Sequence, residues 1–93
     1  MAEAKKPTSL FLTTEAVEDL KFWTRNSPAK VVRITKLLDA ILTDPYSGIG
    51  KPKALKHSLE GAWSRRIDSE HRIIYEVVGD TVNITALRGH YEK

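Results

Sequence analysis

The chain has 93 residues, of which 41% are hydrophobic and 29% are charged, a net charge of +3 and no cysteine. This length fits one domain with a core that is stable without disulfides, and the lack of cysteine excludes thiolate catalysis and zinc sites with cysteine ligands. No apolar run is long enough to span a membrane, and the first residues lack the pattern of a secretion signal. We therefore expect a cytoplasmic, non-membrane protein with a disordered leader over residues 1–7 and a single domain over residues 8–93.

The first half of the chain predicts a short strand followed by two helices. Residues 8–13 have the composition of a strand, and the threonines that follow can cap a helix over residues 14–26 that starts with acidic side chains. Ser27-Pro28 is a helix-start signal, and apolar residues then recur at helical spacing over residues 28–43. We expect the second helix to pack antiparallel to the first.

The second half predicts strands. Asp44-Pro45 stops the second helix, and glycines and prolines keep the chain irregular up to a short strand at residues 53–56. Three further strands are predicted at residues 62–67, 71–78 and 81–88. The fold class is α+β with a β-α-α-β-β-β order, in which the two helices cover one face of a twisted, mainly antiparallel sheet and the other face stays partly open.

Alternation along residues 71–78 assigns side chains to the two faces of that sheet. Side chains two residues apart share a face, so two sets lie on opposite faces. One set is Arg72, Ile74 and Glu76, and the other is His71, Ile73, Tyr75 and Val77. We expect Arg72 and Glu76 to face the open side, and Trp63 and Tyr75 to pack in the core or on the sheet.

Basic residues are concentrated in one stretch. Residues 51–66 contain five lysines and arginines against one acid, Glu60, although the pI of the whole chain, near 9.3, is only mildly basic. A focused basic charge of this kind suits binding to a phosphate polymer, for which RNA is the first hypothesis, while a solvated basic surface is the alternative.

Residues near the C-terminus supply groups for cleaving RNA without a metal. Such cleavage requires cations for the crowded phosphorane and an acid for the departing 5′-oxygen, and a histidine can change protonation state near neutral pH. His90 is the candidate acid, and Tyr91 could stack on a base or donate to a phosphate. Arg65, Arg66 and Arg72 could bind phosphate oxygens, but Arg65 and Arg66 are adjacent, so only one of them can serve the site.

The other two histidines, His57 and His71, are interpreted as spectators. The three histidines are spaced by 14 and 19 residues, which matches no known metal-ligand pattern, and no acidic residue stands at ligand spacing. We therefore expect no metal site and no cofactor.

A set of short motifs resembles the YoeB (Txe) branch of the RelE superfamily of bacterial toxins. The resemblance covers about half of the chain and implies a RelE-like microbial RNase fold. The motifs that carry it are Asp44-Pro45-Tyr46, Gly48, Gly50-Lys51-Pro52, Leu55-Lys56-His57, Leu59, Gly61, Trp63-Ser64-Arg65-Arg66-Ile67, Glu70-His71-Arg72, Tyr75-Glu76-Val77 and His90-Tyr91.

The resemblance also implies an activity and partners. Proteins of this kind are toxins of type II toxin–antitoxin systems and act as ribosome-dependent endoribonucleases, which cut mRNA in the A site of the 70S ribosome. A partner antitoxin, here of the YefM or Axe type, neutralises them by folding a disordered tail over the toxin, and they reach operator DNA only in complex with it. Homodimerisation is compatible with the resemblance.

Residue roles follow from the same resemblance. It implies that His90 is the general acid, that Arg72 stabilises the transition state and that Tyr91 is a second terminal contributor. It further implies that Arg66 and Lys56 bind substrate phosphates. Lys51 and Arg65 complete the candidate substrate-binding set.

One position departs from the family pattern. Lys53 stands where the family typically has a glutamate that acts as general base. Lysine side chains have an ordinary pKa of about 10.4, so an electrostatic role on the 2′-oxygen and the phosphorane is more economical than a role as base. Glu60, Glu70 and Glu76 are candidate replacement bases.

Three alternatives remain open from the sequence. The chain could be a working ribonuclease, or a catalytically impaired relative that binds the ribosome, RNA or its antitoxin and blocks translation without cutting. The third is a regulatory protein that acts mainly through an antitoxin complex on operator DNA.

Overall fold

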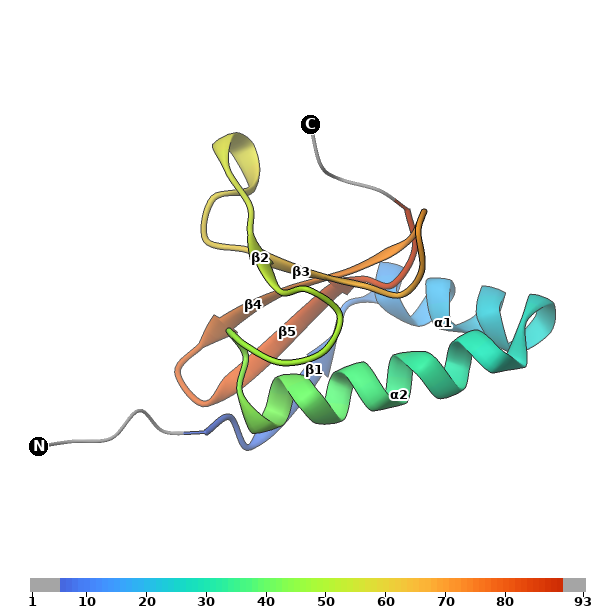
Figure 1. Ribbon diagram of the computed structural model, residues 1–93, viewed down its shortest axis with the longest axis horizontal. Helices are drawn as coiled ribbons and strands as arrows, with labels where there is room; N and C mark the ends of the chain where they lie inside the picture. Colours follow the sequence, from blue (N-terminus) through green and yellow to red (C-terminus); the bar gives the residue numbers. More distant parts are fainter. Residues whose placement is uncertain (1–5, 90–93) are drawn as a thin grey trace, which may run out of the picture.

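The computed structural model describes residues 6–89 and confirms the predicted α+β fold. Two helices lie on one face of a five-stranded sheet whose strand order is β1-β5-β4-β3-β2 (Figure 1). The elements are β1 (Ser9–Leu12), α1 (Thr14–Asn26), α2 (Pro28–Thr43), β2 (Lys53–Ala54), the 3₁₀ turn η1 (His57–Leu59), β3 (Trp63–Arg66), β4 (Arg72–Val78) and β5 (Thr81–Ala86).

The sheet is mixed. Strands β2, β3, β4 and β5 pair antiparallel with their neighbours in chain order, whereas β1 pairs parallel with β5 along the far edge. In chain order, α1 and α2 follow β1 and precede the other four strands. A parallel pair needs a long crossover connection, and the segment from β1 to β5 that contains these helices supplies one.

The helix boundaries match the sequence signals. Thr13 caps α1 by accepting a hydrogen bond from the backbone N–H of Ala16 at 3.1 Å. Ser27 separates the two helices, and its backbone N–H donates to the carbonyl of Trp23 at 2.8 Å. The Ser27 side chain makes no capping bond, so the start of α2 relies on Pro28 in its first turn.

The main core lies between the helices and the sheet. The apolar faces of α1 and α2 pack on side chains that alternate along β4 and β5, as the period-two pattern predicts. Residues with no exposed surface in this core are Ala16, Ile34, Leu37, Ile41, Ile73, Tyr75, Val82, Ile84 and Leu87.

A smaller cluster covers part of the opposite face. Leu55 packs with Ile74 and Ala86, and the partly buried Leu59 and Ala62 lie against this cluster. Figure 1 shows the turn η1 rising from the sheet on the side away from the helices. This face is therefore closed at one end by residues 55–62.

All five predicted strands are shorter than expected, by one or two residues, and for two of them the structure gives a reason. The strand at 53–56 ends at Ala54, because the chain must bend, with His57 in the left-handed region at a φ of +62°, to bring Leu55 over the sheet. The strand at 81–88 ends at Ala86, because the backbone of Leu87 bonds to side chains of α1. No helix within residues 6–89 is long and apolar enough to cross a bilayer.

Candidate functional site

Three of the predicted cationic residues share the sheet face that points away from the helices. Strand register pairs Arg66 with Arg72, and it pairs Ser64 with both Ile74 and Lys53. Residues paired across a ladder lie on the same face, and Ile74 packs in the small cluster opposite the helices. The strands therefore bring Lys53, Arg66 and Arg72 together on one surface.

The pairing of Arg66 with Arg72 places like charges directly opposite each other, which destabilises a sheet. The two side chains have different environments. Arg66 is exposed, whereas Arg72 is only 3% exposed and its Nη1 donates to the carbonyls of Asp68 at 2.9 Å and His71 at 3.2 Å. The sequence prediction that Arg72 faces an open surface is therefore wrong in one respect: its face is correct, but the side chain is buried.

The basic loop before β2 lies along the outer edge of β3. The carbonyl of Gly50 accepts a hydrogen bond from the backbone N–H of Arg66 at 2.7 Å, and Lys53 then pairs with Ser64. Lys51 and Lys53 are exposed in this stretch, beside the exposed Arg66. Lys51 itself has a φ of +53°, a conformation that residues other than glycine adopt only in tight turns.

Lys56 follows β2 and lies directly before the 3₁₀ turn η1. It stands at the start of η1 and is exposed, as is Glu60 after that turn. Glu76 is also exposed, on the same sheet face as Arg72, which confirms its predicted orientation.

Arg65 lies on the helix side of the sheet and is fully buried. Its Nε donates to the hydroxyl of Tyr75 at 3.1 Å, its Nη1 to the carbonyl of Ile49 at 3.1 Å, and its Nη2 to the carbonyls of Asp44 and Ser47. The predicted role of Arg65 as a substrate contact does not fit this environment, because the side chain is buried and each of its three nitrogens donates to a group inside the protein. Arg65 instead fastens the loop over residues 44–50 to the sheet.

The same loop has two further anchors. Hydrogen bonds from the backbone N–H of Tyr46 and the hydroxyl of Ser47 lower the pKa of Asp44 below its ordinary 3.8. Burial raises the pKa of Tyr75 above its ordinary 10.0, so its hydroxyl stays protonated and donates to the carbonyl of Pro45. The core position of Tyr75 was predicted, and Trp63 packs against the same core.

The predicted general acid His90 and its neighbour Tyr91 lie outside the described residues. Gly89, the last described residue, is anchored on both sides of its backbone. Its N–H donates to Nδ1 of His71 at 2.9 Å, and its carbonyl accepts from the N–H of Arg72 at 2.9 Å. Gly89, the residue before His90, therefore lies beside Arg72.

Sequence reasoning missed the contacts that hold this end of β5. His71 was interpreted as a spectator, yet its ring accepts the Gly89 bond, and Trp23 and Asp19 of α1 bond the backbone of Leu87. The only available signal was the i, i+4 spacing of Asp19 and Trp23 on one helix face. Nothing local indicated partners more than 60 residues away.

The turn before β4 orients Arg72. Asp68 accepts hydrogen bonds from the backbone N–H groups of Glu70 at 2.8 Å and His71 at 2.6 Å, and it pairs with Lys30 at 3.0 Å. Partial burial would raise the pKa of Asp68, but these bonds outweigh it and the pKa falls below its ordinary 3.8. Glu70, one of the candidate replacement bases, is an exposed residue of this turn.

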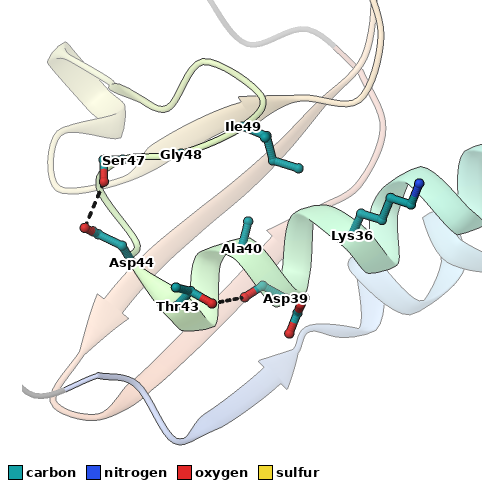
Figure 2. Close-up of a pocket in the computed structure, with 8 residues that line it drawn as sticks. All are labelled: Lys36, Asp39, Ala40, Thr43, Asp44, Ser47, Gly48 and Ile49. Atoms are coloured by element: carbon teal, nitrogen blue, oxygen red, sulfur yellow. Dashed lines mark hydrogen bonds between the residues drawn. The ribbon is translucent and has the colours of Figure 1, made fainter.

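A separate groove lies between the end of α2 and the loop that follows it (Figure 2). This groove contains none of the cationic residues that share the open sheet face. Elsewhere within residues 6–89, as in the groove, no group of three histidine, aspartate or glutamate side chains could hold a metal ion. The groove is lined by Lys36, Asp39, Ala40, Thr43, Asp44, Ser47, Gly48 and Ile49.

Comparison with known structures defines the class of protein to which this fold and site belong. The chain superimposes on a YoeB/ParE toxin from Agrobacterium tumefaciens with a TM-score of 0.87 and 36% identity, over 90% of this chain and 100% of that one. It also matches YoeB in a YoeB–YefM toxin–antitoxin complex from Staphylococcus aureus (TM-score 0.81, 37% identity, 88% and 95% coverage). A YoeB dimer from the same organism matches with a TM-score of 0.84 and 35% identity, over 94% of this chain and 100% of that one.

Sequence comparison gives the family. Residues 12–91 match the model of the YoeB-like toxin of bacterial type II toxin–antitoxin systems. The toxin RelK of Mycobacterium tuberculosis is 47% identical over 77 residues, which cover 83% of this chain and 91% of that protein. The chain belongs to the YoeB family of type II toxin–antitoxin toxins.

Proposed function

We propose that this toxin is a ribosome-dependent endoribonuclease that cuts mRNA in the A site of the 70S ribosome and so inhibits translation. The observation that carries the proposal is the cross-strand pair of Arg66 and Arg72, with Lys53 on the same face. Two arginines held opposite each other repel in the free protein, and a phosphodiester bound between them would remove that repulsion. Binding to an anion would then explain why the protein keeps two arginines whose mutual repulsion lowers its stability.

The proposed reaction divides the work among these groups. The 2′-oxygen attacks the adjacent phosphorus, the bond from phosphorus to the 5′-oxygen breaks, and the 2′-hydroxyl proton passes to solvent. Arg72 and Lys53 stabilise the charge on the phosphorane, while His90 donates a proton to the departing 5′-oxygen and Tyr91 assists at the chain end.

Substrate binding falls to the exposed cations. Arg66, Lys51 and Lys56 are exposed, and we propose that they bind the phosphates that flank the cleavage site. Arg72 is buried and held by backbone carbonyls, which fixes its orientation before substrate arrives. Such preorganisation favours a role in the transition state over simple attraction.

Primer extension on mRNA in purified 70S ribosomes with a defined A-site codon tests the proposal. We expect the unmodified protein to cut within the A-site codon and His90→Ala to leave the message intact. Cleavage by His90→Ala at the rate of the unmodified protein would remove His90 from the mechanism. Circular dichroism of both proteins controls for folding.

A second candidate function is inhibition by binding without cutting. It is favoured by Lys53, which stands at the position where the family resemblance implies a glutamate. In this case translation in a purified system would stop while the message stayed whole, and only Lys53→Glu would produce cuts. Cuts by the unmodified protein would exclude this candidate.

We further propose that the partner is an antitoxin of the YefM or Axe type in the bacterial cytoplasm. The related Staphylococcus aureus YoeB forms a complex with YefM, and a dimer of that YoeB is also known. Co-expression of this chain with the antitoxin from the same operon should relieve growth arrest and give a stable complex. Operator DNA should bind that complex but not the toxin alone, and sedimentation of the toxin alone tests homodimerisation.

A further inference from the structure

The segment after β5 is held largely by side chains, beside one backbone bond from the N–H of Arg72 in β4 to the carbonyl of Gly89. Nε1 of Trp23 donates to the carbonyl of Leu87 at 2.7 Å, and Oδ2 of Asp19 accepts from its N–H at 3.0 Å. Two residues later, Nδ1 of His71 accepts from the N–H of Gly89 at 2.9 Å. The guanidinium of Arg88 lies over the ring of Phe22 at 3.7 Å. Each of residues 87, 88 and 89 is therefore tied to another element.

The imidazole of His71 is itself fixed in place. Its ring meets the ring of Trp23 edge to face, with centroids 4.9 Å apart and planes at 85°, and Trp23 is only 4% exposed. The Nδ1 atom accepts the hydrogen bond from Gly89 through its lone pair, so this contact requires the neutral ring with its proton on Nε2. A buried aromatic side chain thus orients a specific acceptor toward Gly89.

We propose that His71 is a positioning residue for the proposed acid, because its Nδ1 holds the backbone of Gly89, the residue before His90, beside Arg72. This inference rests on the proposed function, because it gives His90 its role as acid. Consecutive Cα atoms are about 3.8 Å apart, so the anchored backbone of Gly89 limits where His90 can start. The carbonyl of Gly89 is bonded to the N–H of Arg72, which ties the same point to the proposed transition-state arginine.

The geometry explains why a side chain does this work. The paired part of β5 ends at Ala86, so the N–H of Gly89 has no ladder partner in β4. Without the acceptor on His71, that N–H would bond to water and the backbone at Gly89 would gain freedom. In enzymes, a displacement of about 1 Å at a catalytic group can cost on the order of 100-fold in rate.

Three variants separate positioning from folding. His71→Leu removes the acceptor, and His71→Asn restores one, because Oδ1 of asparagine occupies nearly the place of Nδ1. His57→Asn is the matched control, since His57 is exposed and asparagine tolerates its positive φ. Single-turnover cleavage on programmed ribosomes gives the maximal rate and the half-saturating protein concentration for each.

We expect His71→Leu to lower the maximal rate by about 10- to 100-fold with an unchanged half-saturating concentration, because the phosphate-binding cations are untouched. We expect His71→Asn to recover most of that rate and His57→Asn to match the unmodified protein. The inference is overturned if His71→Leu cuts at the normal rate, or if His71→Asn is as slow as His71→Leu. It is also overturned if the rate loss equals the fraction of unfolded protein measured by urea titration.

Amide hydrogen exchange at Gly89, measured by NMR, keeps this inference separate from the proposed function. Exchange should be slow in the unmodified protein and in His71→Asn, and fast in His71→Leu, whether or not any of them cuts RNA. If the unmodified protein cuts nothing but shows this pattern, the anchor is real and the proposed function has failed. Equal exchange in all three proteins would contradict the anchor itself.

Discussion

The two faces of the sheet treat two consecutive arginines in opposite ways. Arg65 faces the helices, has no exposed surface and bonds to carbonyls of the loop over residues 44–50. Arg66 faces away from the helices, is exposed and stands opposite another arginine. Residue type alone therefore does not identify a binding residue. Whether other elements cover a face of the sheet decides whether a guanidinium on that face is structural or available to a ligand.

The largest expected effect on stability comes from replacing the buried arginine, Arg65. Arg65→Met should destabilise the protein by about 3–5 kcal/mol, because three backbone carbonyls and the Tyr75 hydroxyl lose a charged donor inside the protein. Urea unfolding measures this. Arg66→Met is the matched control and should change stability by less than about 0.5 kcal/mol. Equal losses for the two variants would contradict the assignment of their environments.

The next effect concerns the loop that Arg65 fastens. Gly50 has a φ of +85°, and an added Cβ would lie 2.7 Å from Cδ2 of Leu37 and 3.2 Å from Cβ of Arg65. We expect Gly50→Ala to cost about 2–4 kcal/mol, from strain and from the clash in the core. Gly79→Ala controls for φ alone, since Gly79 has a φ of +63° and open space around it. The second variant should cost only about 1 kcal/mol in thermal or urea unfolding.

A smaller effect is expected at the turn that orients Arg72 on the open face. The pKa of Asp68 is lower in the folded state than its ordinary 3.8. Its carboxylate therefore stabilises the fold above pH 3.8, and the contribution is lost as the pH falls below that value. Asp68→Asn should cost about 1 kcal/mol at neutral pH and nothing in strong acid. Urea unfolding at several pH values measures this, and a cost independent of pH would contradict it.

The smallest effect on stability should accompany a clear effect on RNA. Arg66→Ala removes one of two opposed charges, so stability should stay within about 0.5 kcal/mol or rise slightly. Binding to a short single-stranded RNA, followed by fluorescence anisotropy, should weaken, and the slope of log K against log salt should fall by about 0.7. An unchanged slope would mean that Arg66 touches no phosphate. Arg25→Ala, which removes an exposed arginine of α1, is the charge-matched control and should leave the slope as it is.

Much of the fold followed from local signals. The bounds of both helices were predicted because caps, proline and apolar spacing act within a few residues. The ends of β2 and β5 were not, since Leu55 packs across the sheet and Leu87 bonds to α1. Strand length there depends on partners that sequence spacing does not reveal.

The sequence likewise predicted some features of the candidate site and missed others. Alternation along the strands placed Arg72 on the correct face and set Arg65 opposite to Arg66. It could not show that Arg72 is buried and bonded to the turn at Asp68, or that His71 holds Gly89. Those features arise where separate turns and chain ends meet.

The sequence by itself determined the elements, the alternation of faces and the family, because these depend on neighbours along the chain. Only the tertiary structure decided which arginine is structural and which histidine has a partner. Arg65 bonds to carbonyls 16 to 21 residues away, and Trp23 bonds to Leu87 across 64 residues. Burial and hydrogen bonding of this kind arise from contacts between distant segments, and no local pattern encodes them.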